Sequence, residues 1–323
     1  MAGAAWGLSV EIVSHDLLQA LAIFAAGLAA GTINTVVGSG TLITFPTLLA
    51  FGYPPVLANV SNNVGLVPGG FSGAHGYRAE LAGQRRRVIR LGSASLCGGL
   101  VGALLLLVLP AGAFKEIVPA LIGVALVMVV FQPRLARWVA ARQRTRAAAP
   151  GESACDAEGD EDAGGAGGAG GVKGPGGPAV ALAGAEDAGG QAAVGVLQPV
   201  RQEAALQVGG PVLWVLVFLS GVYGGYFGAA QGVLLIGLMG VAFTDSLQRI
   251  NAVKNLLAGL VNGTAALVFI CVTHVDWGVA GLIAAGSIIG GQVGARVGKR
   301  LPPWGLRVLI VCVGTAALVK LLA

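Results

Sequence analysis

The sequence predicts an all-α polytopic membrane protein, and three observations lead to that prediction. Of its 323 residues, 55% are hydrophobic and only 11% are charged, with a mean hydropathy of +0.80. A globular domain in water carries about 25% charged residues, so this chain has too few to cover a water-facing surface. Apolar runs of roughly twenty residues recur along it, each able to cross a hydrocarbon core of about 30 Å as a helix. These observations argue against a soluble enzyme, a nucleic-acid-binding protein and a secreted disulfide scaffold.

The composition divides the chain into four segments. An N-terminal segment (residues 1–16) is followed by a first hydrophobic repeat (17–132), a linker (133–209) and a second hydrophobic repeat (210–323). The first apolar run has neither a basic region before it nor a clear cleavage site after it, so we expect a retained span. The linker is first basic and then rich in Gly, Ala and acid; nine of the 15 acidic residues lie between Glu152 and Glu203. Such a stretch buries too little apolar surface to fold, which predicts a disordered cytoplasmic spacer or, alternatively, a regulatory tail.

The two hydrophobic halves resemble each other at a nearly constant offset. Early in each half, three residues match three others: Phe24, Gly27 and Gly31 with Phe218, Gly221 and Gly225. Later matches include Gly98, Gly99 and Gly102 with Gly290, Gly291 and Gly294, and Gly38 pairs with Gly232. An internal duplication of a helical membrane unit is typical of transporters, whose substrates bind where the repeats meet.

Loop charges predict that the two repeats are inverted. The loop of residues 78–90 is rich in arginine, whereas its partner around His274 to Trp277 has no Lys or Arg. Conversely, the turn from Pro110 to Lys115 has one base, whereas its partner carries Arg296, Lys299, Arg300 and Arg307. Cytoplasmic loops of membrane proteins are enriched in Lys and Arg, so corresponding loops should lie on opposite sides.

Inversion requires an odd number of segments per half, which a broken first helix supplies. In the first half we expect pieces at 17–36 and 41–52, joined by residues 37–40, followed by spans near 56–77, 88–109 and 114–132. In the second half the break should fall at residues 228–232. The piece at 41–52 would be about 18 Å long, too short to span, so it should begin inside the membrane. The total is about eight full spans plus half-helices.

The first break combines glycines with polar side chains, Asn34, Ser39 and Thr41 among them. Non-helical backbone at membrane depth is tolerated where it lines a cavity or is buried in protein. A helix that starts at Thr41 would direct unpaired N–H groups and its positive dipole end into the membrane, which favours an anion. Gln231 and Gly232 occupy the matching place, and the amides of Thr41 and Val233 should carry much of the binding. The alternative is that the glycines only permit close helix packing.

A second polar group lies within LANVSNN (residues 57–63) and its counterpart RINAVKN (residues 249–255). Lys254 lies inside a predicted span with no acid within one turn. An intramembrane lysine costs about 2.5 to 3.5 kcal/mol, so it is functional by default and favours an anionic partner. The alternative is that its ammonium reaches the membrane interface by snorkelling. The candidate substrate-binding residues are therefore Asn34, Gly38, Ser39, Gly40, Thr41, Ser61, Asn62, Gln231, Gly232, Lys254 and Asn255. No pattern of catalytic or metal-ligating residues emerges, and the four cysteines are scattered, so we expect no cofactor.

Several runs together resemble the sulfite exporter TauE/SafE family, also called the 4-toluene sulfonate uptake permease family. They are GTINTVVGSGTLITFPTLLAFGYPPVLANVSNN, INAVKNLLAGLVN, VDW and GGQVGARVGKRLP. The chain departs from the family where Gly38-Ser39-Gly40 replaces a run of glycines and where Ser61 replaces Thr. The resemblance implies about eight spans in a four-plus-four duplication. It also implies transport of sulfur-containing anions such as sulfite, thiosulfate or organosulfonates.

These observations predict a multi-pass transporter of the cytoplasmic membrane for small sulfur-containing oxyanions. An anion leaving a cell that is negative inside by 100 mV gains about 2.3 kcal/mol per charge, which favours an exporter or facilitator. The expected partners are the anion, the lipid bilayer and possible coupling ions, with no nucleic acid; the oligomeric state is left open. Two alternatives remain: a non-transporting scaffold or sensor that acts through the linker, and a cation channel or carrier. Deleting residues 151–195 would abolish the function of a scaffold and leave a carrier active.

Overall fold

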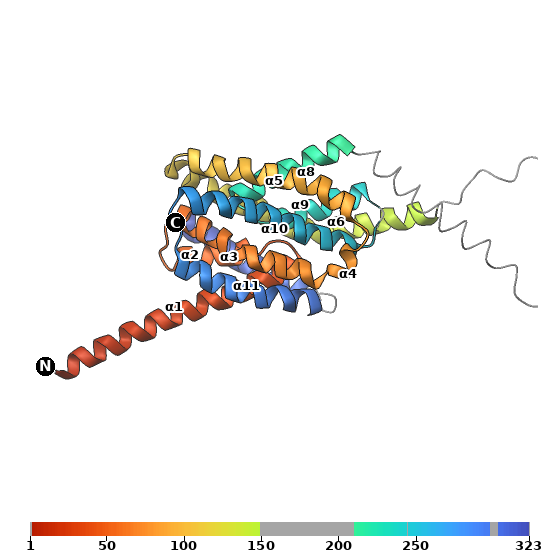
Figure 1. The fold of residues 1–323 in the computed structure, drawn as a ribbon. Coiled ribbons are helices and arrows are strands. Elements are labelled where there is room, and N and C mark those ends of the chain that lie inside the picture. Colours follow the sequence, from red (N-terminus) through yellow and green to blue (C-terminus); the bar gives the residue numbers. More distant parts are fainter. Residues whose placement is uncertain (1, 149–209, 244, 298–302, 323) are drawn as a thin grey trace, which may run out of the picture. The chain divides into compact units, whose positions relative to one another are not determined.

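The structure is a computed structural model that describes residues 2–148, 210–243, 245–297 and 303–322, and every regular element in these ranges is a helix (Figure 1). The first half comprises α1 (Ala2–Val36), α2 (Thr41–Ala50), α3 (Pro55–Gly76), α4 (Arg78–Leu81), α5 (Arg85–Val108) and α6 (Ala111–Ala148). The second comprises α8 (Gly210–Tyr226), α9 (Gln231–Ala242), α10 (Leu247–Val272), α11 (Trp277–Val297) and α12 (Pro303–Leu322). The all-α fold is therefore confirmed.

Both first helices are broken close to where the sequence predicted. Helix α1 ends at Val36 and α2 begins at Thr41, and α8 ends at Tyr226 and α9 begins at Gln231. We call the connecting residues 37–40 break 1 and residues 227–230 break 2. The short helices α2 and α9 have 10 and 12 residues, too few to cross a bilayer.

Within the described ranges, five helices are long and apolar enough to cross a membrane, namely those covering 16–36, 85–108, 112–134, 247–272 and 277–296. Helix α3 has 22 residues but falls outside this group. Its asparagines Asn59, Asn62 and Asn63 lower its hydropathy, although all three are buried against other helices. The predicted total of about eight spans stays a prediction.

Helix α6 extends further than the sequence suggested. Residues 133–148 were assigned to the linker, but they continue α6 as a helix. The reason is local, because these residues contain no glycine and many Arg and Ala, which favour helix. The predicted disorder of the rest of the linker falls on residues 149–209, which lie outside the described residues.

The helices of the two halves pack in reciprocal pairs through small residues. Helix α1 lies along α11, where Gly27 contacts Ile283 and Gly31 contacts Ser287. Helix α5 lies along α8, where Gly98 contacts Gly221. Glycines let helix backbones approach closely, and such close packing is a main way in which helices associate inside a membrane. Since residue numbers rise together in the first pair, α1 and α11 run in the same direction.

Helices α3 and α10, which the predicted repeat relates to each other, run in opposite directions. Tyr77, which follows the end of α3, packs against Ala252 near the start of α10. The same end of the molecule carries α4 and the arginines at the start of α5. Opposed equivalent helices are what an inverted duplication produces. The duplication itself stays a prediction.

Candidate functional site

Break 1 is a tight turn in which the first two amides bond back to α1 and the next amides have no backbone acceptor. The N–H groups of Val37 and Gly38 both donate to Ile33 O, at 2.7 and 3.0 Å. Gly38 has φ of +93°, a left-handed conformation that glycine adopts without strain. The chain then reverses into α2, whose first residue has no side-chain cap. Break 1 therefore ends α1 and starts α2 with backbone donors that are buried but unpaired.

Break 2 repeats this turn. The N–H groups of Phe227 and Gly228 both donate to Tyr223 O, at 3.0 and 3.2 Å. Gly228 has φ of +80° and Ala230 has φ of +59°. The sequence offset paired Gly38 with Gly232, but the left-handed glycine that corresponds to Gly38 is Gly228. That prediction was wrong by one helical turn, because the offset followed glycine matches and not the conformation that the turn requires.

The two breaks touch each other. The N–H of Gly232 donates to Gly38 O at 3.2 Å, and a Cβ on Gly38 would overlap the Cα of Gly232. The rings of Phe45 in α2 and Phe227 in break 2 pack edge to face, 5.3 Å apart. The positive ends of α2 and α9 therefore lie in one buried region, as the sequence suggested.

This region holds hydrogen-bond donors without protein partners. The amides of residues 39–41 and 229–231 have no acceptor among the described residues. The same is true of two side-chain atoms, Ser39 Oγ and Gln231 Nε2, in residues that are 0% and 3% exposed. Buried donors in folded proteins are nearly always bonded, so a group of unpaired ones requires an explanation. The arrangement can accept a ligand that is rich in hydrogen-bond acceptors.

Helix α3 supports the start of α2. Thr44 Oγ1 donates to Asn62 Oδ1, and Asn62 Nδ2 lies 3.5 Å from Thr41 Oγ1. Ser61, another predicted site residue, instead accepts a hydrogen bond at 3.0 Å from the backbone N–H of Asp276. Asn62 therefore lies at the start of α2, whereas Ser61 bonds to the loop before α11.

Each half supplies the donors that cap the broken helix of the other half. Asn59 Nδ2, from α3, donates to Tyr226 O at the end of α8, at 3.0 Å. From α10, Lys254 Nζ donates to Asn34 O and Thr35 O at the end of α1, at 2.9 and 3.1 Å. Thr35 O also accepts from the Nδ2 atoms of Asn251 and Asn255, at 3.0 and 3.3 Å. Carbonyls at a helix end need such donors.

Lys254 is fully buried at 0% exposure, and no carboxylate among the described residues forms an ion pair with it. The alternative that its ammonium reaches the interface is therefore wrong. Its charge lies at the negative end of the α1 dipole, which stabilises it. Val233 also differs from expectation, because its N–H donates to Ala230 O at 3.0 Å.

Three residues of this region were not among the predicted site residues, and two of them, Asn59 and Asn251, lie on α3 and α10. Both could have been found, because each shares a helix face with predicted site residues. Asn59 lies three residues before Asn62, and Asn251 lies three residues before Lys254. A third, Gln132 of α6, approaches Val37 O at 3.5 Å. No sequence signal pointed to Gln132, since its contact depends on how α6 packs.

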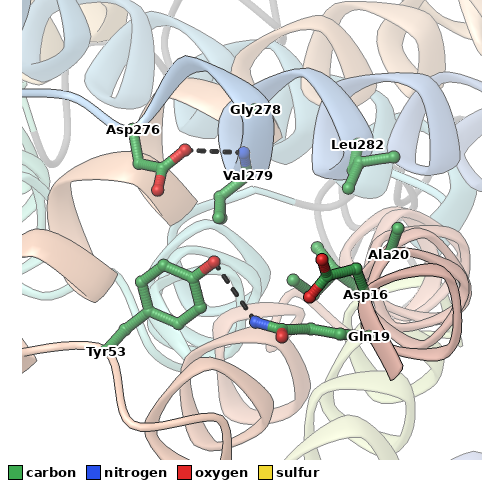
Figure 2. A pocket seen from close by; sticks show the side chains of 9 residues that line it. Asp16, Gln19, Ala20, Tyr53, Asp276, Gly278, Val279 and Leu282 are labelled. Atoms are coloured by element: carbon green, nitrogen blue, oxygen red, sulfur yellow. Dashed lines mark hydrogen bonds between the residues drawn. The ribbon is translucent and has the colours of Figure 1, made fainter. Parts of the chain in front are cut away.

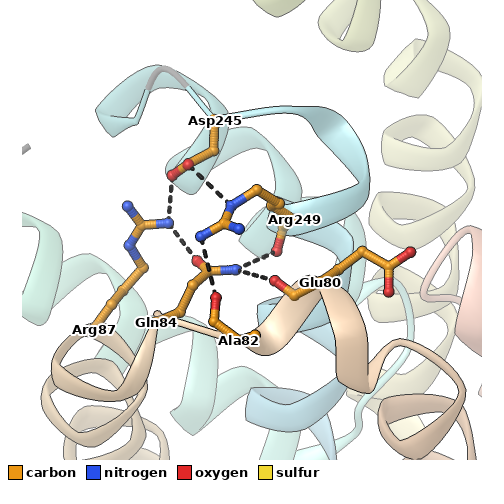
Figure 3. Close-up of polar contacts among 6 residues, drawn as sticks. All are labelled: Glu80, Ala82, Gln84, Arg87, Asp245 and Arg249. Atoms are coloured by element: carbon orange, nitrogen blue, oxygen red, sulfur yellow. Dashed lines mark hydrogen bonds and ion pairs between the residues drawn. The ribbon is translucent and has the colours of Figure 1, made fainter. Parts of the chain in front are cut away.

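At the end of the molecule where α5 begins, a polar cluster joins the two halves (Figure 3). Asp245, between α9 and α10, forms ion pairs with Arg87 of α5 and with Arg249. Arg87 also donates to Gln84 Oε1 at 2.6 Å, and its guanidinium stacks over the Phe243 ring at 3.8 Å. Arg87 and Asp245 are only 7% and 13% exposed, so the cluster fastens α5 to the α9–α10 loop in a shielded place.

The opposite end has an acidic cavity (Figure 2). Its lining includes Asp16 and Gln19 of α1, Tyr53 between α2 and α3, and Asp276 before α11. Gln19 Nε2 donates to Tyr53 OH at 3.3 Å, and Asp276 accepts from Val279 N–H at 3.0 Å. Burial and the Asp276 carboxylate raise the pKa of Tyr53, so its phenol is protonated at neutral pH. Within the described ranges, no three His, Cys, Asp or Glu side chains gather as metal ligands.

The sequence model of one protein family, described as "Sulfite exporter TauE/SafE", matches residues 23–321. The chain belongs to this family. Among curated proteins, it is similar to a "Probable membrane transporter protein" of Haemophilus influenzae, with 30% identity over 123 residues, which is 38% of this chain and 48% of that protein. It is also similar to "Probable membrane transporter protein ORF9" of a Sinorhizobium species, with 30% identity over 105 residues, or 32% and 40% of the two chains.

The match therefore spans less than half the length of each of these relatives. No solved structure matches the chain. TauE/SafE membership and the relatives' names support a role in membrane transport, and the apolar helices agree with a multi-pass membrane protein. In a membrane transporter, the unpaired donors at the two breaks are candidates for binding the transported solute.

Proposed function

We propose that this TauE/SafE family member is a transporter of the cytoplasmic membrane that moves small sulfur-containing oxyanions, such as sulfite, thiosulfate or organosulfonates. The observation that carries the proposal is the group of buried, unpaired donors at the two breaks. Six backbone amides, Ser39 Oγ and Gln231 Nε2 supply them. The family description, sulfite exporter, supports the choice of anion.

An oxyanion suits these donors in charge and in shape. Its oxygens accept several hydrogen bonds at once, and the N-termini of α2 and α9 add positive potential from two directions. Away from water, each such bond is electrostatically stronger than it would be in solution. The buried ammonium of Lys254 adds a positive charge nearby. A cation would meet the wrong sign of potential in this region.

Transport requires that the region open to each side of the membrane in turn. Gly228 of break 2 and Asn34 in the last turn of α1 are only partly buried, so this region is not sealed on every side. At the arginine-rich end, the Arg87–Asp245 ion pair joins the halves and must separate if they move apart there. The positive-inside rule assigns that end to the cytoplasm. We infer that the described conformation is closed toward the cytoplasm by this cluster.

The electrical gradient favours outward movement. A monoanion that leaves a cell negative inside by 100 mV gains about 2.3 kcal/mol, and a dianion about twice that. Asp16 and Asp276 line the acidic cavity, and its lining includes no residue of break 1 or break 2. We therefore propose export or facilitated diffusion, which needs no coupling ion.

Counterflow of labelled sulfite into liposomes that contain the purified full chain tests the proposal. Sulfite inside the liposomes should accelerate uptake of the label, whereas phosphate, acetate and sodium should not. Gly83 offers a matched control to Gly38, because both have positive φ but nothing lies within 4 Å of a Cβ on Gly83. Gly83→Ala should retain counterflow and Gly38→Ala should lose it. Sodium flux without sulfite flux would refute the oxyanion proposal.

A further inference from the structure

We propose that Lys254 is a positioning residue that keeps α1 broken, and that it acts on the anion through break 1 without binding the anion itself. The proposal rests on the proposed function, because it explains how the donors of that site are kept free. It replaces the direct contact between ammonium and anion that the sequence suggested.

The argument begins with what α1 would do without Lys254. In an uninterrupted α-helix each amide donates to the carbonyl four residues before it. Gly38 would then donate to Asn34 O, and Ser39 to Thr35 O. In the structure Gly38 donates to Ile33 O instead, and the Ser39 amide has no acceptor. The two carbonyls that these amides would use are the two that accept from Lys254.

Lys254 therefore occupies the acceptors that would let α1 continue. Its ammonium has three protons, and two of them are directed at these carbonyls. Asn251 and Asn255 add two further donors to Thr35 O, so this carbonyl has three partners from one helix. A cation holds a helix C-terminus better than a neutral amide does, because it also meets the negative end of the dipole.

The stem of Lys254 contacts break 2 as well. A Cβ on Gly232 would lie 3.0 Å from Lys254 Cδ, and Gly232 N–H donates to Gly38 O. One side chain thus lies against the end of α1 and the start of α9 together. Its full burial and its place between the breaks suit a residue that fixes their geometry.

Hydrogen exchange of the purified full chain, measured without any anion, tests this directly. In Lys254→Met the carbonyl of Asn34 loses its donor, and Thr35 O keeps only the neutral amides of Asn251 and Asn255. The amide of Gly38 should therefore gain the most protection as α1 extends, and the amides of residues 39 and 40 should gain less. Lys254→Gln keeps a neutral amide donor, so the protection of the break 1 amides should lie between those of the wild type and Lys254→Met. This variant also tests the proposal if Lys254→Met does not fold. The peptide over break 2 is the internal control and should change less. Exchange at break 1 that is unchanged or faster would overturn the proposal.

Sulfite binding supplies the second measurement. Lys254→Met should weaken sulfite affinity at least tenfold, and Lys254→Gln should weaken it less. Because Lys254 and Asn251 share Thr35 O, the double variant with Asn251→Ala should depart from the sum of the single changes. Equal losses in the Met and Gln variants, additive with Asn251→Ala, would mean that the ammonium binds the anion. Since the exchange experiment contains no anion, it can fail or succeed independently of the transport proposal.

Discussion

Break 1 and break 2 have the same turn but different caps. In both, two successive amides donate to a carbonyl near the helix end, and a glycine adopts a left-handed conformation. At break 1 the freed carbonyls receive the ammonium of Lys254 and two asparagine amides. At break 2, Tyr226 O receives one amide, from Asn59.

Comparing the breaks distinguishes the contribution of the glycine turn from that of the charged cap, which break 1 alone would not do. Break 2 has its turn with a left-handed glycine, local backbone bonding and a neutral cap, whereas break 1 has the same turn with a charged cap. The charge is an addition, present at break 1 alone among the described parts of the two breaks. The comparison therefore predicts that turn-breaking substitutions act at both breaks, whereas charge-removing substitutions act mainly through break 1.

The largest effect is expected from Gly38→Ala. The substitution adds left-handed strain of about 1 to 2 kcal/mol and a backbone overlap with Gly232 that costs about 1 to 3 kcal/mol more. Gly228→Ala adds the strain, but its Cβ would lie 3.2 Å from the nearest atom, Gly224 O. Unfolding free energies in mixed micelles should fall roughly twice as far for Gly38→Ala. Equal losses would mean that contact between the breaks contributes little.

Gln231→Met should stabilise the protein while weakening anion binding. It replaces a buried side chain whose Nε2 has no partner, so the anion-free protein should gain about 1 kcal/mol. Loss of one donor should weaken sulfite binding about tenfold, which corresponds to about 1.4 kcal/mol. Ser220→Ala is the matched control, because Ser220 Oγ is also buried and unpartnered but lies well before the end of α8. If both variants bind sulfite like the wild type, Gln231 is not part of the site.

Most of the helices and both breaks could be predicted from the sequence, but fewer of the contacts within the site could. Apolar runs located the helices, and Gly38 with Gly40 and Gly228 with Gly232 located the breaks, because glycine punctuates helices whatever their tertiary context. The acceptors of Lys254 could not be predicted, since they belong to the other half and depend on how α10 meets α1. The same limit explains why Gly232 was matched to Gly38 and was instead found packed against it.

Asn59→Ala should have a moderate effect that is confined to break 2. Asn59 is the side-chain donor to Tyr226 O, and its removal leaves a buried carbonyl unpaired at a cost of about 1 to 3 kcal/mol. Hydrogen exchange should therefore rise over residues 226–230 and stay unchanged over residues 36–40. Exchange that rises equally at both breaks would show that they open as one unit, and the distinction between their caps would lose its meaning.

Asn251→Ala should have the smallest effect, although Asn251, like Asn59, donates to a carbonyl at the end of a broken helix. Thr35 O keeps two donors, Lys254 and Asn255, so the substitution removes a hydrogen bond without leaving the carbonyl unpaired. The net contribution of one such bond is about 0.5 to 1.5 kcal/mol, and the remaining donors should reduce the loss to the low end of that range. The unfolding free energies of the Asn59→Ala and Asn251→Ala variants, measured side by side, check this. A loss in Asn251→Ala as large as in Asn59→Ala would mean that the ammonium does not hold Thr35 O, since an acceptor that keeps a charged donor should tolerate the removal of a neutral one.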